Sequence, residues 1–207
     1  MIVEIAEKLV NEFVENKVID EEEKDVYKYG TELMVSQFIG IGIVFLLGTI
    51  LGLMWETITF IICFVMIRVY AGGFHASSYR NCMISFGVSY IGILFLGEWI
   101  NKNQLSNWVM LCLVFAGIII VILAPIEDKN KPLDASEYQK CRVKARKQTV
   151  LWSTVICISY WSMPNRRTII VYGALAICEL AVLLIAGLIK NKRNSKEEKD
   201  DYSCNMR

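Results

Sequence analysis

Long apolar stretches alternate with short charged ones along this chain, and the apolar stretches are long enough to cross a membrane. A helix needs about 20 residues to span the ~30 Å hydrocarbon core of a bilayer. By that measure the pattern predicts six spans, at residues 37–54, 57–71, 83–99, 107–126, 148–163 and 168–189. The second stretch is short, and the fifth is rich in polar residues. The pattern therefore predicts an all-α polytopic membrane protein with about six transmembrane helices.

The first residues predict an amphipathic helix ahead of the spans. At helical spacing, one face collects Ile2, Ile5, Leu9 and Phe13, whereas Glu and Lys occupy the other face. Such a helix could lie on the cytoplasmic leaflet, dock on a partner or pack as an ordinary surface helix. We therefore expect an interfacial segment at 1–36, a membrane domain at 37–189 and a charged cytoplasmic tail at 190–207.

The distribution of Lys and Arg predicts the orientation of the spans. With the N-terminus inside, 19 of the 22 basic residues fall on the cytoplasmic side and three fall outside. An excess of basic residues on the cytoplasmic side is the usual arrangement in membrane proteins. We therefore expect both termini to be cytoplasmic.

Composition narrows the classes further. With 55% hydrophobic and 21% charged residues, the chain is too apolar to be disordered. The net charge of +1 gives no indication of nucleic acid binding, so no such partner is expected. The seven cysteines are irregularly spaced and odd in number, and there is one histidine. They predict neither a disulfide framework nor a zinc cluster, and we expect no metal and no cofactor.

The segment between the second and third predicted spans carries the candidate chemistry. It contains the sole histidine, His75, and then Cys82 seven residues later. The preceding Gly72-Gly73 pair frees the backbone, and the charges of Arg68 and Arg80 favour a thiolate. On an unbroken helix, seven residues rise ~10.5 Å, so His75 and Cys82 can act together only if the chain bends between them.

These residues resemble the signature of the accessory gene regulator B (AgrB) family, the membrane cysteine endopeptidases of Gram-positive quorum sensing. The resemblance lies in Gly73-Phe74-His75 followed by Cys82, in the six-span topology and in the later Asn130-Lys131-Pro132-Leu133. It implies that Cys82 is the catalytic nucleophile and His75 its general base, in a peptidase domain at 37–189 of a cell-membrane protein. Arg68 and Gly73 would support them, at an active site near the cytoplasmic face.

The resemblance also implies the reaction and the partner. Cys82 would cleave an AgrD-type precursor peptide at its acidic C-terminal tail and form an acyl-enzyme thioester. A cysteine of the peptide would then close a cyclic thiolactone, the autoinducing peptide. Three further residues could orient the imidazole or donate to the oxyanion, although turn formation explains them more simply: Ser77, Ser78 and Asn81.

A basic loop is expected between the fourth and fifth predicted spans. It carries five positive charges, on Lys140, Arg142, Lys144, Arg146 and Lys147. They could contact anionic lipid, at about 1 kcal/mol for each basic residue near the surface. They could equally hold the acidic tail of the precursor, and the two interpretations are compatible.

Other classes of function compete with the peptidase. Six spans and an intramembrane carboxylate, Glu179, would suit a small transporter or channel, although no inverted repeat is visible. A membrane sensor holding a metal between His75 and Cys82 is a third alternative, with a poor ligand set. Whether the chain acts as a homodimer is left open.

Overall fold

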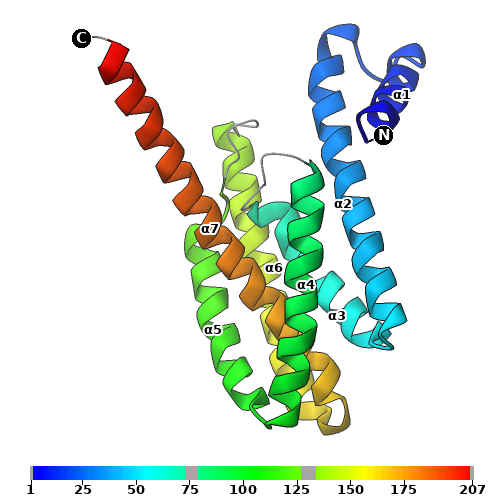
Figure 1. The fold of residues 1–207 in the computed structure, drawn as a ribbon, viewed down its shortest axis with the longest axis vertical. Coiled ribbons are helices and arrows are strands. Elements are labelled where there is room, and N and C mark those ends of the chain that lie inside the picture. Colours follow the sequence, from blue (N-terminus) through cyan, green and yellow to red (C-terminus); the bar gives the residue numbers. More distant parts are fainter. Residues whose placement is uncertain (1, 73–78, 127–133, 206–207) are drawn as a thin grey trace. The chain divides into compact units, whose positions relative to one another are not determined.

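The computed structural model describes residues 2–72, 79–126 and 134–205, the last twelve of these and residues 79–80 by backbone only. The described residues are almost entirely helical (Figure 1). The long helices are α1 (Ile2–Glu15), α2 (Lys24–Ile50), α3 (Met54–Ala71), α4 (Tyr79–Lys102), α5 (Ser106–Leu123), α6 (Ala135–Ser162) and α7 (Arg167–Asn205). Two short 3-10 helices, Glu21–Glu23 and Pro164–Arg166, precede α2 and α7. The predicted all-α polytopic fold is confirmed.

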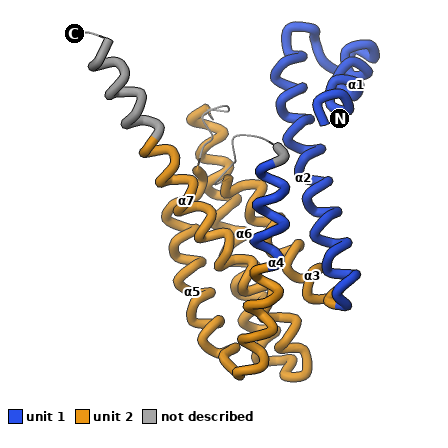
Figure 2. The backbone as a smooth tube through the Cα atoms, viewed as in Figure 1, with its two compact units in different colours: residues 1–52, 76–91 blue, residues 53–75, 92–207 orange. Residues whose placement is uncertain are grey.

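Two compact units divide the chain (Figure 2). Unit 1 comprises residues 1–52 and 76–91, and unit 2 comprises residues 53–75 and 92–207. The helix α4 therefore contributes its first half to unit 1 and its second half to unit 2. The predicted division at 36 and 189 stays a prediction.

In unit 1, α1 packs against α2 through the smaller residues of its apolar face. Ala6 and Val10 are fully buried, whereas Ile5, Leu9 and Phe13 remain about 40% exposed. A salt bridge of 3.3 Å between Lys28 Nζ and Glu7 Oε2 adds to the contact. The predicted amphipathic helix thus exists and docks on α2, with part of its apolar face still uncovered.

The buried face of α2 consists mainly of small residues spaced four apart: Ser36, Gly40, Val44 and Gly48. Small residues let membrane helices approach closely. A Cβ added to Gly40 would lie 3.6 Å from the ring of Phe86 on α4. The first half of α4 therefore packs along this face, and both helices run in the same direction (Figure 1).

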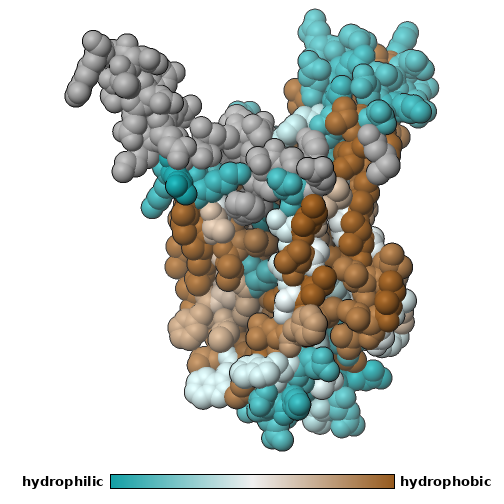
Figure 3. Space-filling model, in the orientation of Figure 1, coloured by the Kyte–Doolittle hydropathy of each residue, from teal (hydrophilic) through white to brown (hydrophobic). Residues whose placement is uncertain are grey.

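Unit 2 is built around α7, which packs against α3, α5 and α6. Of its most apolar stretch 67% is buried, against 22–33% for the other candidate spans. Glycine lets α7 approach α3 closely, because a Cβ on Gly173 would lie 3.1 Å from Cys63 Sγ on α3. The outer faces of the unit 2 helices are apolar along their middle and hydrophilic at their ends (Figure 3). A lipid-facing surface has this pattern.

Five helices are long and apolar enough to cross a membrane, and α6 is not among them within the described residues. Nevertheless α6 runs antiparallel beside the whole of α5. Its Arg146 contacts Val121 near the end of α5, and its Tyr160 hydroxyl donates to Asn107 Oδ1 at the start, over 2.8 Å. If α5 crosses the membrane, α6 spans the same depth, so we retain residues 148–163 as the sixth, more polar, span.

Candidate functional site

Cys82, the predicted nucleophile, lies in the first turn of α4 within unit 1. Its side chain is half-buried and its thiol is free. Cys82 and Phe86 are four residues apart and share one face of the helix, and Phe86 lies against Gly40 of α2. Because α2 and α4 run in parallel, Cys82 lies one turn above this contact, at about the level of the buried Ser36.

The N-terminal position of Cys82 has a chemical consequence. Backbone N–H groups in the first turn of a helix have no intrahelical partner, and the helix dipole is positive at this end. Both features can stabilise negative charge that develops on a reacting carbonyl oxygen nearby. The start of α4 therefore offers backbone donors beside the thiol of Cys82.

Four of the other predicted site residues fall outside the described residues: Gly73, His75, Ser77 and Ser78. The spatial relation of His75 to Cys82 accordingly stays a prediction. Asn81 is described and lies exposed in the first turn of α4, next to Cys82. Its role in orienting the imidazole or the substrate is likewise untested.

Arg68 and Gly72 shape the end of α3 in unit 2. The half-buried Arg68 donates from Nη1 to the carbonyl oxygen of Gly72, over 2.6 Å. Gly72 has φ 66° and ψ −139°, a region that is essentially restricted to glycine. The chain is then held by Ile126, whose N–H donates to the Ala71 carbonyl over 3.0 Å. Gly72 thus ends α3.

The basic segment is not a loop, and this expectation was wrong. The helix α6 begins at Ala135, so all five predicted basic residues lie on its first turns. A continuous helix forms here because residues 135–147 contain no Gly or Pro and are rich in Lys, Arg, Ala and Glu, which are strong helix formers. Apolar periodicity alone misses it, because this part of the helix is polar.

The five basic residues have different surroundings. Lys140, Lys144 and Lys147 are exposed, and Lys144 Nζ lies 5.2 Å from the centre of the Tyr70 ring. Arg142 and Arg146 are half-buried. Arg146 donates from Nε to the carbonyl oxygen of Val121 over 3.0 Å, which satisfies an acceptor near the end of α5. Arg146 therefore makes a structural contact within unit 2, whereas the side chains of the three lysines are exposed.

Glu179 lies inside unit 2 rather than on its outer face. It is 8% exposed, in the middle of the buried stretch of α7. A carboxyl group this deep in a membrane helix is costly. Among the alternatives considered for Glu179, this position favours the bundle interior.

Sequence reasoning missed two contributors to the end of α3. Gly72 was treated as part of a flexible pair, although it is the residue whose conformation requires glycine. Ile126 was counted as the last residue of a span, whereas it leaves α5 and bonds to Ala71. A Gly-Gly pair directly after an apolar helix is a signal for the first; nothing in the sequence indicates the second. Among the described residues, no three His, Cys, Asp or Glu side chains cluster as metal ligands.

Fold and site together define a multi-pass, all-helical membrane protein with a free cysteine at the start of one membrane helix. The profile of the Accessory gene regulator B family matches residues 6–189. The chain belongs to this family.

Named relatives agree with this assignment. An AgrB-like protein of Clostridium perfringens (strain SM101) is 28% identical over 152 residues, which cover 69% of each chain. An AgrB-like protein of Listeria innocua is 26% identical over 160 residues, covering 75% of each. No solved structure matches the chain significantly. The family places the chain in the accessory gene regulator quorum-sensing system, in the membrane, and implies association with an AgrD-type propeptide.

Proposed function

We propose that this protein is a cysteine endopeptidase that cleaves the tail of an AgrD-type precursor and leaves the signalling portion as a cyclic thiolactone. The observation that carries the proposal is the position of Cys82. Its free, half-buried thiol lies in the first turn of α4, seven residues after the sole histidine of a chain that the family profile matches. A cysteine at a helix start is well placed for nucleophilic chemistry.

The proposed reaction has two exchanges at one carbonyl carbon. The Cys82 thiolate attacks the carbonyl that joins the future pheromone to its tail, and backbone N–H groups at the start of α4 stabilise the oxyanion. The C–N bond breaks, and His75 gives its proton to the leaving amine. An acyl-enzyme thioester remains. A cysteine thiolate within the peptide then attacks the same carbonyl, closes the ring and releases the Cys82 thiolate.

The ring closure requires that water does not reach the thioester first. One thioester is exchanged for another, so the step is nearly isoenergetic, whereas hydrolysis would be irreversible in practice. The packing of Cys82 on the α2-facing side of α4 supports the proposal, because a half-buried thiol is partly shielded from water. We place the site near the cytoplasmic face, following the distribution of Lys and Arg.

Lys140 and Lys144 are the proposed contacts for the acidic tail of the precursor. Both are exposed on the first turns of α6, at the end of unit 2 where α3 ends. Replacing Lys140 and Lys144 together by Glu should raise the precursor concentration needed for half-maximal cleavage by about tenfold. The paired control is Lys102→Glu on α4. If the double variant cleaves like wild type at every precursor concentration, these lysines do not bind the tail.

Cleavage by single variants tests the catalytic pair. Mass spectrometry of a co-expressed precursor should find the cut and cyclised product with wild type and with Cys141→Ala, another half-buried free thiol. Cys82→Ala and His75→Ala should give uncut precursor. Cleavage by Cys82→Ala would end the proposal.

A further inference from the structure

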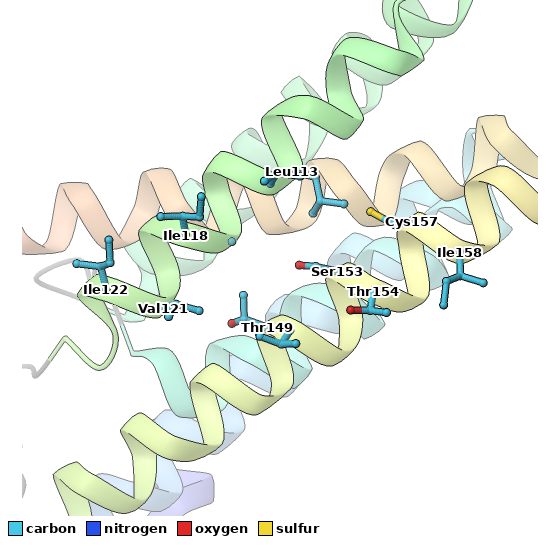
Figure 4. Close-up of a pocket in the computed structure, with 12 residues that line it drawn as sticks. Leu113, Ile118, Val121, Ile122, Thr149, Ser153, Thr154, Cys157 and Ile158 are labelled. Atoms are coloured by element: carbon cyan, nitrogen blue, oxygen red, sulfur yellow. The ribbon is translucent and has the colours of Figure 1, made fainter.

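An open groove runs between α5 and α6 in unit 2 (Figure 4). Its volume is about 430 Å³. One wall comes from α5, including Leu113, Gly117 and Val121, and the other from α6, including Thr149 and Ser153. The lining is almost wholly apolar, and the groove opens on the outer face of unit 2. Neither the peptidase chemistry nor the family assignment gives it a role.

The dimensions of the groove decide what can fill it. It extends from Leu113 to Ile122 along α5, a rise of about 14 Å, close to one leaflet of the ~30 Å hydrocarbon core. An extended acyl chain matches this length and the almost wholly apolar lining of the groove.

Basic side chains lie at one end of the groove. The exposed wall of α6 is formed by Val150, Thr154 and Ile158, and Lys147 lies exposed on the same face, one turn closer to the start of α6. The inner wall is formed by Thr149 and Ser153, and the same face carries Arg146 and Arg142 closer to the start of α6. The buried Nε of Arg142 has no hydrogen-bond partner among the residues that the structure describes. This end lies next to Val121, where α5 approaches its C-terminus.

We propose that this groove binds one acyl chain of an anionic phospholipid, with its phosphate held by Lys147 and Arg142. The apolar channel accepts the chain, and the two cations accept the headgroup at the inner boundary of the membrane. The lipid would fill the space between α5 and α6. Lys147 would then bind the lipid, whereas Lys140 and Lys144 would remain for the peptide.

Native mass spectrometry of the full-length protein in detergent tests the proposal, with phosphatidylglycerol and phosphatidylcholine of identical chains as probes. Wild type should hold one phosphatidylglycerol about tenfold more tightly than phosphatidylcholine. Gly117→Leu should abolish this retention, because its side chain would enter the groove. Its control is Gly92→Leu on α4, where a Cβ meets nothing within 4 Å. Lys147→Glu should weaken phosphatidylglycerol binding about tenfold, and Lys102→Glu should not.

Three results would overturn the proposal. Equal retention of both lipids by wild type would remove the headgroup site. Full retention by Gly117→Leu, or by Thr154→Trp on the exposed wall should Gly117→Leu fail to fold, would show that the lipid lies elsewhere. Loss of a co-purifying second copy or precursor from Gly117→Leu, with lipid unchanged, would show that a protein fills the groove. Peptide cleavage is read separately, so failure of the peptidase proposal leaves this test intact.

Discussion

Gly72 occupies the position at which the structure most strictly requires glycine. Its backbone conformation is almost restricted to glycine, and a Cβ there would collide with the carbonyl oxygen of Ile126. Arg68 donates to its carbonyl, and the neighbouring Ala71 accepts from Ile126. This one position therefore fixes how the chain leaves α3 toward the segment that contains His75.

We predict that Gly72→Ala lowers the free energy of unfolding by more than about 2 kcal/mol, because backbone strain and a collision add together. Gly52→Ala is the matched control: Gly52 also has positive φ, 73°, but a Cβ there meets nothing within 4 Å. It should lose only about 1 kcal/mol. Thermal unfolding in detergent micelles measures both. Equal losses would show that the contact with Ile126 is unimportant.

Much of the residue-level assignment could be read from the sequence, and its gaps have physical causes. Cys82 stands out because it follows the chain's single histidine and two glycines at a span boundary. The distinct roles of Arg146 and Lys144 could not be read, because both are basic residues in one polar stretch. Only packing shows that Arg146 bonds to Val121 while Lys144 stays exposed over Tyr70.

At the scale of elements, the pairing of α2 with the first half of α4 positions Cys82. The buried face of α2 is a row of mostly small residues, and Gly40 meets Phe86 one turn from Cys82. Apolar stretches predicted both helices but not where they begin. The helix α2 begins at Lys24, well before the expected residue 37. The prediction missed its first turns because they are polar. Hydropathy finds the part of a helix in the membrane and misses the part in water.

A bulky side chain on this face should displace the start of α4. We predict that Gly40→Leu lowers the rate of Cys82 alkylation by a thiol-reactive probe, and precursor cleavage with it, by about tenfold or more. Gly42→Leu lies two residues along the same helix, where a Cβ meets nothing within 4 Å, and should react like wild type. If both variants react like wild type, packing against α2 does not position Cys82.

The antiparallel pairing of α6 with α5 predicts that α6 crosses the membrane despite its low hydropathy. In a cysteine-free background, Met163→Cys should react with a membrane-impermeant thiol reagent added to intact cells. Lys140→Cys should react only after the cells are opened. Reaction of both positions only after opening would indicate that α6 turns back within the membrane, and the sixth span would be lost.

At the scale of the whole molecule, the sequence predicted the class of protein. Segregation of charge from long apolar stretches predicts a polytopic helical protein, because unpaired charges are excluded from hydrocarbon. The division into two compact units could not be predicted, since it depends on which helices share buried faces rather than on hydropathy. The central position of α7 is likewise a matter of packing, although its high content of Ala and Gly is typical of a buried helix.

The central claim, that Cys82 carries the substrate as a thioester, can be tested by trapping that intermediate. A precursor whose internal cysteine is replaced by alanine can acylate the enzyme but cannot close the ring. Incubated with this peptide, the intact protein should gain the mass of the precursor without its tail, and peptide mapping should place the added mass on Cys82. Cys141→Ala should gain the same mass and Cys82→Ala none. An unmodified enzyme that nonetheless releases the tail, or an adduct on another residue, would contradict the mechanism.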